Sequence, residues 1–253
     1  MSLQQEFAAV AREDGRAALV TVLQGPHLGE KMLVSVDGSC EGTLGDPDLD
    51  AEARQSAEEL IWAGRSERRG ALFIDVTNPD PRIVIFGAVE FATHLSALAR
   101  IAGWRPYVVD PRARFATPER FPAALGVVAA WPEEAFEQLG PPDRATYIVI
   151  LTHDPKLDDA ALLIALRSEV PYIGAMGSKR AQADRRERLL AADVSEQEMA
   201  RISAPVGLDL GASGARETAL SIMAELVAVR HGREGGRLSD AKGGSIHSAA
   251  AKA

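Results

Sequence analysis

Residues 82–92 read Arg-Ile-Val-Ile-Phe-Gly-Ala-Val-Glu-Phe-Ala and decide the fold. Five residues of strand character run into Gly87, and an apolar helical stretch continues to Gly103. A strand, a glycine turn and a helix in this order are typical of the first unit of a nucleotide-binding parallel sheet. The usual three-glycine fingerprint is altered, because Val89 takes its second position and Ala92 its third. This stretch therefore predicts the fold more directly than it predicts the ligand.

Strands and helices alternate from this unit as far as His231. Strands are predicted over residues 105–110, 126–130, 147–151 and 170–173, and helices over residues 132–138, 157–167, 180–191, 195–200 and 215–230. This alternation predicts a parallel sheet with helices on both faces. Residues 147–151 are continuously apolar, as expected of a strand that is covered on both faces. We therefore expect a Rossmann-like α/β domain over residues 82–231.

Residues 1–77 predict a smaller α/β domain. Asp37-Gly38 lies between two β-rich runs and signals a hairpin turn. Asp46 and Pro47 are residue types that begin a helix. Residues 78–81 read Asn-Pro-Asp-Pro and predict a linker, because proline can continue neither a helix nor a strand ladder.

Composition argues against several classes of function. The net charge is -8, whereas a nucleic-acid surface needs clustered basic residues. No apolar run approaches the roughly 18 residues of a membrane span, and residues 1–12 lack the pattern of a signal peptide. We therefore expect a cytoplasmic protein without a nucleic-acid or membrane partner. Residues 232–253 have no periodicity and few large apolar side chains, which predicts a disordered tail.

Polar stretches follow several strands of the predicted sheet. The carboxyl ends of parallel strands meet at one edge, and ligands bind there. The candidate cofactor-binding residues at this edge are Gly87, Ala88, Asp110, Arg112, Thr152, His153, Asp154, Gly174, Gly177, Ser178, Lys179 and Arg180. The loop at residues 208–211 is a further candidate for the same edge.

Two of these stretches favour an anionic ligand. Asp110 lies about 20 residues past the glycine turn, where dinucleotide folds place a carboxylate on a ribose hydroxyl; alternatively it only ends a strand. Arg112 suits a phosphate held through two hydrogen bonds, and Arg114 is expected to be solvated. Residues 174–178 read Gly-Ala-Met-Gly-Ser and offer backbone amides at a helix start, followed by Lys179 and Arg180. The alternative for this second stretch is an ordinary turn with two solvated cations.

No catalytic or metal-binding residue can be assigned from spacing. His153 ends a strand and suits a hydrogen bond to a ligand, a general base or a metal ligand. A metal site needs several ligand residues, and no two histidines have the spacing that would place them on one face of a helix. The single cysteine, Cys40, excludes a disulfide scaffold and a multi-cysteine zinc site. We expect it to be a small, buried strand residue, with a soft ligand or nucleophile as the alternative.

Three motifs carry a resemblance to a known family. Residues 149–154 read Val-Ile-Leu-Thr-His-Asp, residues 172–180 read Tyr-Ile-Gly-Ala-Met-Gly-Ser-Lys-Arg, and residues 205–211 read Pro-Val-Gly-Leu-Asp-Leu-Gly. They resemble the V-V-L-T-H-D, Y-I-G-x-x-G-S-x-x and P-I-G-L-D-I-G motifs of the XdhC/CoxI family, the accessory factors for xanthine dehydrogenase and carbon monoxide dehydrogenase. The resemblance covers the C-terminal half almost throughout, whereas the first domain matches mainly in layout.

The resemblance implies a small N-terminal domain and a Rossmann-like domain in an oligomer with a non-catalytic role. Such factors bind molybdenum cofactor (molybdopterin), protect it during sulfuration and deliver it to an apo-molybdoenzyme. The implied partners are the apo-molybdoenzyme, a cysteine desulfurase and further copies of the chain. The phosphate on the pterin suits the predicted anion site at Lys179 and Arg180.

Two departures from the family pattern make this chain a divergent member. The family turn G-A-G-H-V-A reads Gly-Ala-Val-Glu-Phe-Ala here, and both Val89 and Glu90 should weaken the binding of an anion. The family run G-G-C-V-E has its nearest counterpart in residues 38–42, Gly-Ser-Cys-Glu-Gly, and no role is carried over to Cys40. Two alternatives stay open. One is an NAD(P)-dependent oxidoreductase that uses Gly87 and Asp110, and the other is an interaction subunit without a small ligand.

Overall fold

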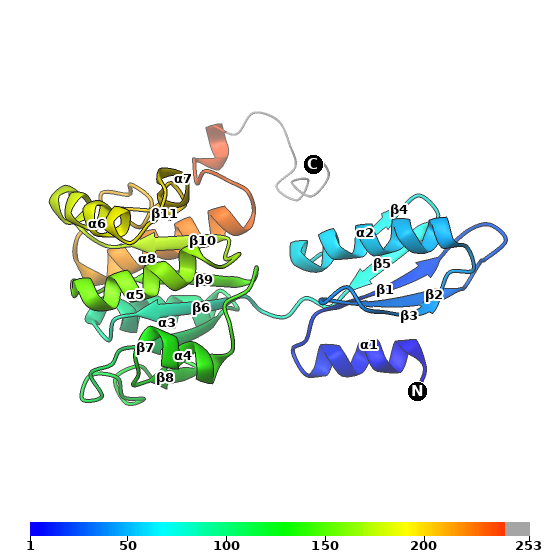
Figure 1. The fold of residues 1–253 in the computed structure, drawn as a ribbon, viewed down its shortest axis with the longest axis horizontal. Coiled ribbons are helices and arrows are strands. Elements are labelled where there is room, and N and C mark those ends of the chain that lie inside the picture. The colour runs from blue at the N-terminus through cyan, green and yellow to red at the C-terminus, as the bar shows by residue number, and fades with distance from the viewer. Residues whose placement is uncertain (241–253) are drawn as a thin grey trace. The chain divides into compact units, whose positions relative to one another are not determined.

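The computed structural model describes residues 1–240 and divides the chain into two compact units (Figure 1). The first unit is Met1–Asp80 and the second begins at Pro81. Residues 241–253, which belong to the predicted disordered tail, lie outside the described residues. Within residues 1–240, no helix combines the length and the apolar character needed to cross a bilayer.

The first unit is a five-stranded antiparallel sheet with two helices. Its elements are α1 (Leu3–Arg12), β1 (Ala17–Val22), β2 (Lys31–Ser35), β3 (Cys40–Thr43), α2 (Pro47–Ala63), β4 (Glu67–Arg69) and β5 (Leu72–Val76). The strand order is β3-β2-β1-β5-β4. Val34 and Cys40 are partners across β2 and β3, which confirms the predicted hairpin. Cys40 is half-buried and contacts the core of this unit.

Helix α2 begins as its residue types predict. The side chain of Asp46 accepts hydrogen bonds from the backbone N–H groups of Asp48 (2.8 Å) and Leu49 (3.2 Å), and so caps the helix. The helix buries Leu60 and Ile61 in the core of the sheet. It ends at Gly64, which has a φ of 63°. Helix α1 has no fully buried residue, although it packs on the other side of the strands (Figure 1).

The second unit is a six-stranded sheet in which every strand pair is parallel. Its elements are β6 (Arg82–Phe86), α3 (Glu90–Ile101), β7 (Arg105–Val109), β8 (Gly126–Val128), α4 (Pro132–Leu139), β9 (Thr146–Ile150), α5 (Pro155–Leu166), β10 (Tyr172–Ala175), α6 (Lys179–Ala191), α7 (Glu196–Met199), β11 (Ile202–Ser203), α8 (Gly214–Arg230) and the short 3₁₀ helix η1 (Leu238–Asp240). The strand order is β11-β10-β9-β6-β7-β8. Counted from β8, this is the 3-2-1-4-5-6 order of dinucleotide-binding sheets. The predicted Rossmann-like fold is confirmed.

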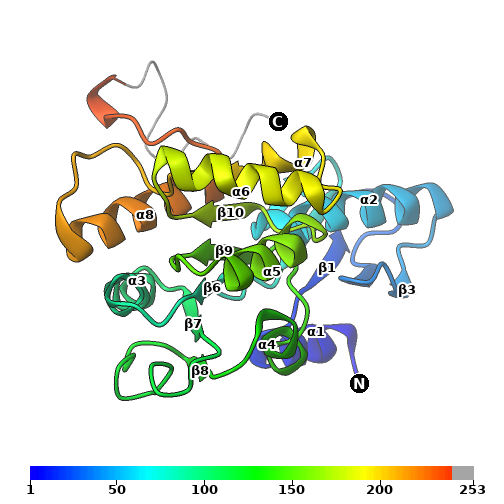
Figure 2. The same ribbon diagram turned by 60° about the vertical axis from the view of Figure 1, so that its left-hand side comes forward.

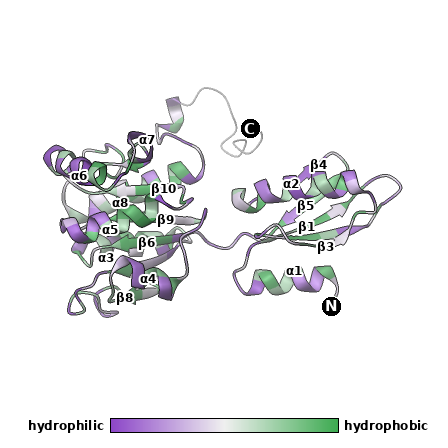
Figure 3. Ribbon diagram, in the orientation of Figure 1, coloured by the Kyte–Doolittle hydropathy of each residue, from purple (hydrophilic) through white to green (hydrophobic). Residues whose placement is uncertain are grey.

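Helices cover both faces of this sheet (Figure 2). Alternate residues of a strand point to opposite faces, so Ile85 contacts Leu95 of α3 and Ile222 of α8 in one core. Phe86 lies in the other core with Leu162 of α5, and α4 and α6 contribute to the same side. Hydrophobic residues accordingly concentrate on the central strands in Figure 3.

Several strands differ from the sequence-based expectation; no strand is predicted at β4, and β8 ends two residues before its predicted end. The sequence predicts that the fifth strand ends at Ile173, but Gly174 and Ala175 continue the pairing with β9. Crowding requires glycine at this strand position, because a Cβ at residue 174 would lie 2.6 Å from Val206 Cγ2. The edge strand β11 has no counterpart among the predicted strands, since a two-residue strand carries no periodicity.

Candidate ligand-binding site at the carboxyl ends of the parallel strands

The strand order reverses at β6, which pairs with β7 on one side and β9 on the other. Such a reversal is the topological switch point at which open α/β sheets bind their ligands. The loops that follow β6 and β9 begin at Gly87 and Leu151. The predicted binding stretches therefore lie at one edge of the sheet, with Gly87 and Thr152 next to each other at its centre.

Gly87 fits its position because the backbone is both left-handed and crowded. Its φ is +111°, a conformation that L side chains rarely adopt. A Cβ at Gly87 would lie 2.9 Å from Thr152 Cγ2 and 3.2 Å from the Thr152 nitrogen. The Gly87 N–H donates to the Val109 carbonyl at 2.8 Å, which ties the turn to β7. Gly87 thus sets the spacing between the loops after β6 and β9.

The next two residues of the turn bear on anion binding. Val89 is the N-cap of α3 and makes no side-chain capping hydrogen bond. Glu90 opens the helix with an exposed carboxylate, and its Oε1 lies 3.7 Å from His94 Nε2. The Glu90 carboxylate already lies at the positive, N-terminal end of the helix dipole, where a bound anion would otherwise be stabilised. The start of α3 is consequently a poor site for a phosphate.

Asp110 is fully buried and makes four hydrogen bonds. Its Oδ2 accepts from the Ala88 N–H (2.8 Å) and from Arg112 Nη2 (2.7 Å), and its Oδ1 accepts from the Arg112 backbone N–H and Nε (both 2.9 Å). Burial alone would raise the pKa of Asp110, but the hydrogen bonds from Arg112 and Ala88 outweigh it and lower the pKa. The structure thus pairs Asp110 with Arg112, the residue predicted to hold a phosphate.

Replacing Asp110 by asparagine tests this pairing. We expect the free energy of unfolding to fall by about 2 kcal/mol at pH 7, because the new amide cannot accept hydrogen bonds from all four donors. The loss stays moderate because Arg112 is half exposed to solvent. The folded state lowers the pKa of Asp110. The carboxylate therefore stabilises the fold fully above its unfolded pKa of about 3.9, and this stabilisation is lost as the pH falls through the folded pKa. Urea unfolding at pH 7 and pH 3 measures both effects; equal stability of the two proteins at pH 7 would contradict the assignment.

A buried network joins the loops after β9 and β10. Thr152 Oγ1 donates to Asp158 Oδ1 at 2.8 Å, and the Asp154 N–H donates to Thr152 Oγ1 at 2.9 Å. Arg185 Nη2 lies 3.3 Å from Asp158 Oδ2 and donates to the Met176 carbonyl at 2.8 Å. Burial raises the pKa of Asp158, although Thr152 and Arg185 act in the opposite direction. The network fixes two of the predicted binding stretches relative to each other.

Arg185 lies beneath the loop between β10 and α6. The residue is only 5% exposed, and its Nε and Nη1 have no hydrogen-bond partner among the described residues. A Cβ at Gly177 would lie 3.7 Å from Nη2 and 3.8 Å from Nη1 of Arg185. A buried guanidinium group, which is paired with Asp158 but keeps two unused donor atoms, therefore lies under the predicted anion-binding loop.

The start of α6 has the features predicted for an anion site. Ser178 caps the helix by accepting the Ala181 N–H at 3.3 Å. Lys179 and Arg180 are the first two helical residues and both are exposed. The first turn contains no acidic residue, so the positive end of the helix dipole is unopposed there.

His153 and Asp154 complete the loop after β9. His153 is exposed. Asp154 caps α5 through the Lys156 N–H at 3.0 Å. Within the described residues, no group of three or more histidine, cysteine, aspartate or glutamate side chains is placed to hold a metal ion.

The loop at residues 205–211 is held by α8. Glu225 Oε2 accepts hydrogen bonds from the Tyr172 hydroxyl (2.5 Å) and from the Gly207 N–H (2.6 Å). Burial, together with the neighbouring carboxylate of Glu225, raises the pKa of Tyr172. Glu225 thereby connects this loop to β10, the strand that leads into the candidate anion-binding loop.

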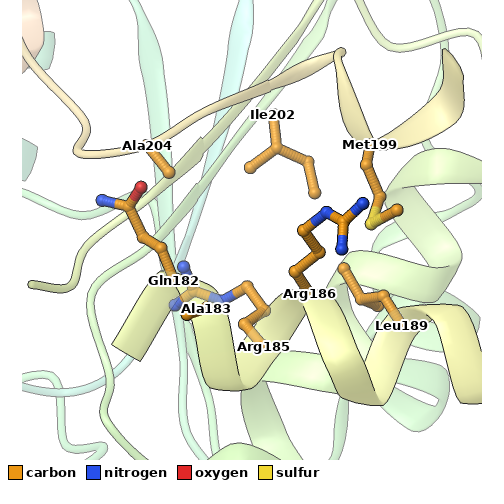
Figure 4. Close-up of a pocket in the computed structure, with 8 residues that line it drawn as sticks. All are labelled: Gln182, Ala183, Arg185, Arg186, Leu189, Met199, Ile202 and Ala204. Atoms are coloured by element: carbon orange, nitrogen blue, oxygen red, sulfur yellow. The ribbon is translucent and has the colours of Figure 1, made fainter. Parts of the chain in front are cut away.

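A groove of about 270 Å³ lies between α6 and the α7–β11 segment (Figure 4). Its lining residues are Gln182, Ala183, Arg185, Arg186, Leu189, Met199, Ile202 and Ala204. Arg186 forms an ion pair with Glu196 of α7, and Gln182 donates to the Gly177 carbonyl at 3.1 Å. The groove thus adjoins the candidate anion-binding loop through Gln182 and Arg185.

Sequence reasoning missed Asp158 and Arg185. Asp158 belongs to a largely apolar helix, and an acid in its first turn has an ordinary explanation in the helix dipole. Arg185 stands in the run Arg185–Arg188, where exposed cations are the usual outcome. Neither position carries a local signal, because the pairing joins residues 27 positions apart.

Comparison with known proteins identifies the family. Residues 83–226 match the family described as "XdhC Rossmann domain", and residues 10–71 match "XdhC and CoxI family". The chain belongs to the XdhC/CoxI family. The two XdhC matches fall in the two structural units, so the resemblance noted in the sequence is confirmed in both.

Three relatives of this XdhC-family chain are informative. A probable xanthine dehydrogenase subunit of Bacillus subtilis (strain 168) is 30% identical over 73% of this chain and 53% of its own length. "Uncharacterized protein YqeB" of Escherichia coli (strain K12) is 27% identical over 93% of this chain and 48% of its own. "Molybdenum cofactor insertion chaperone PaoD" of the same organism is 28% identical over 60% and 41%. The chain spans about half the length of the curated relatives it matches.

A solved structure supports the fold. The crystal structure of a xanthine dehydrogenase from Bacillus halodurans has a TM-score of 0.64 to this chain, with 24% identity. The match covers 91% of this chain and 67% of the other. At this identity the likeness shows that the two chains share a fold.

Proposed function

We propose that this protein is an accessory factor that binds molybdenum cofactor and assists its maturation and insertion into a xanthine dehydrogenase-type or carbon monoxide dehydrogenase-type molybdoenzyme in the cytoplasm. Family membership and the name of the PaoD relative support the accessory role. The observation that carries cofactor binding is the loop from Gly174 to Arg180, which combines a capped helix start, two exposed cations and the buried Arg185.

The donors at this edge suit a pterin that carries a phosphate. Backbone N–H groups at the start of α6, with Lys179 and Arg180, would hold the phosphate. Arg185 is paired with Asp158, so it would contribute through Nε and Nη1, which have no hydrogen-bond partner among the described residues, rather than through net charge. Gly87 keeps the neighbouring loop close, so that the pterin ring would lie along the ends of β6 and β9.

Restoring the family residues at positions 89 and 90 should raise the affinity for molybdenum cofactor. We expect Val89→Gly combined with Glu90→His to bind isolated molybdenum cofactor about tenfold more tightly, because bulk and negative charge leave the crevice. Isothermal titration of both proteins measures the difference. Glu133→His, which replaces an exposed acid in the first turn of α4, is the matched control for the change of charge. Unchanged or weaker affinity of the double variant would contradict the role given to Val89 and Glu90.

The dinucleotide strand order favours a second candidate, an NAD(P)-dependent oxidoreductase. Asp110 is the residue that this candidate needs on the ribose, and its carboxylate is already engaged by Ala88 and Arg112. Thermal unfolding with NAD and NADP at millimolar concentration separates the candidates. A rise in midpoint with either nucleotide supports the oxidoreductase, and none with nucleotide or molybdenum cofactor supports an interaction subunit without a small ligand.

The proposal includes partners. We propose that the protein acts on an apo-molybdoenzyme, holds the cofactor while a cysteine desulfurase supplies sulfur to it, and forms a homo-oligomer. Deleting its gene tests the first of these directly: the target molybdoenzyme should accumulate without bound cofactor. Normal cofactor content and activity of molybdoenzymes in the deletion strain would refute the accessory role.

A further inference from the structure

The loop between β7 and β8 gathers three arginines around one aromatic ring. The guanidinium carbons of Arg112, Arg114 and Arg120 lie 5.0, 4.4 and 5.4 Å from the centre of the Phe115 ring. Arg120 Nη1 also donates to the Phe115 carbonyl at 2.9 Å, which holds that side chain along the loop. Arg114, expected from sequence to be merely solvated, belongs to this cluster.

The cluster adjoins the candidate site through Arg112. The carboxylate that binds Arg112 also accepts the Ala88 N–H of the glycine turn. The Asp154 carboxylate, at the end of β9, raises the pKa of Arg112 after the larger effect of Asp110. Arg112 therefore faces the switch point, and the rest of the cluster extends the same edge beyond β7.

The charge of the cluster is only partly balanced. Asp110 neutralises Arg112. Among residues 1–240, no carboxylate is paired with Arg114 or Arg120, and both are exposed. Contacts with the face of Phe115 hold these guanidinium groups near one another despite their mutual repulsion. In a chain with a net charge of -8, this is a local, preorganised site for an anion.

The cluster and the start of α6 are too far apart to hold one phosphate. The first follows β7 and the second follows β10, with β6 and β9 between them. Three strand spacings separate them, which is about 14 Å. We infer that Arg114 and Arg120 form a second anion subsite, which takes a phosphate ester at the far end of an extended ligand with two anionic groups. The inference rests on the proposed function for the occupant of the first subsite, at Lys179 and Arg180.

An NMR titration of the full ¹⁵N-labelled chain with inorganic pyrophosphate tests each subsite separately. In the wild-type protein, we expect two groups of backbone amides to shift, residues 111–121 and residues 174–181. Arg114→Gln with Arg120→Gln should weaken the first response at least about tenfold and preserve the second. Arg100→Gln with Arg167→Gln removes two exposed cations at the C-terminal ends of α3 and α5, and should change neither response.

The outcomes distinguish the two proposals. Shifts confined to residues 174–181, or an unchanged response at residues 111–121 in the Arg114/Arg120 variant, would overturn the second subsite and leave the proposed function standing. Shifts at residues 111–121 without any at residues 174–181 would sustain the second subsite and count against the proposed cofactor site. The phosphate-ester claim has its own readout: glycerol 3-phosphate should shift residues 111–121 at about tenfold lower concentration than glycerol, and equal responses would refute it.

Discussion

Replacing Arg185 by methionine is expected to lower the free energy of unfolding by about 3 kcal/mol at pH 8. The substitution leaves Asp158, which is 4% exposed, without its buried partner. It also leaves the Met176 carbonyl without the hydrogen bond that holds the anion-binding loop. Methionine keeps the stem volume, so the loss reports charge and hydrogen bonding rather than a cavity.

The pH dependence of this variant has a definite sign. The folded pKa of Asp158 is already raised by burial, and removal of Arg185 raises it further. An acid with a raised folded pKa favours folding most below its unfolded pKa of about 3.9 and opposes it as the pH rises. The difference between the Arg185→Met variant and the wild type should therefore be smaller at pH 5 than at pH 8.

Guanidinium unfolding at the two pH values measures this prediction. Arg186→Met is the matched control, because the neighbouring Arg186 is exposed and, within residues 1–240, forms an ion pair only with exposed Glu196; its cost should stay below about 1 kcal/mol. Replacing Arg185 and Asp158 together by methionine and leucine should restore most of the loss. Equal stability of the Arg185→Met and Arg186→Met proteins would show that the buried pair does not stabilise the fold.

Gly87→Ala is expected to be nearly as costly, at about 3 kcal/mol. Alanine meets two penalties at this position. The φ of +111° is strained for any L side chain, and the new methyl would lie 2.9 Å from Thr152 Cγ2. Because Thr152 is 3% exposed and bonded to Asp158, it cannot move away without breaking the network.

Gly70→Ala separates the two penalties. Gly70 has a φ of +56°, but no atom lies within 4 Å of the place that a Cβ would take, so its replacement carries strain alone. We expect a loss of about 1 kcal/mol there, and a clearly larger one at Gly87, by urea unfolding. Indistinguishable losses at Gly87 and Gly70 would mean that Thr152 does not constrain the turn.

Much of the fold could be predicted because its signals are local. The strand before Gly87 and the apolar run before Thr152 indicate buried parallel strands, and both begin or end within a residue or so of the expected positions. The strand order follows no local signal, yet the glycine turn after the first strand points to it. The failures include β4 and β11, which the sequence does not predict, and the ends of β8 and β10, where strand pairing rather than composition decides the boundary.

The candidate site was predictable only in outline. Residues exposed at strand ends, such as Lys179 and Arg180, are visible in sequence because strand ends of parallel sheets share one edge. The sequence does not predict the pairing of Asp110 with Arg112 or of Asp158 with Arg185. The sequence alone does not show whether a charged side chain is buried. Its partner is selected by the tertiary fold, which places Arg185 of α6 against Asp158 of α5.

Titration of the purified chain, residues 1–253, with isolated molybdenum cofactor tests the central claim most directly. We expect saturable binding, which Lys179→Gln with Arg180→Gln weakens at least about tenfold. The matched control, Arg100→Gln with Arg167→Gln, removes the same charge from the C-terminal ends of α3 and α5 and should bind like the wild type. Absence of saturable binding to the wild-type protein, or equal affinity of both double variants, would contradict the account.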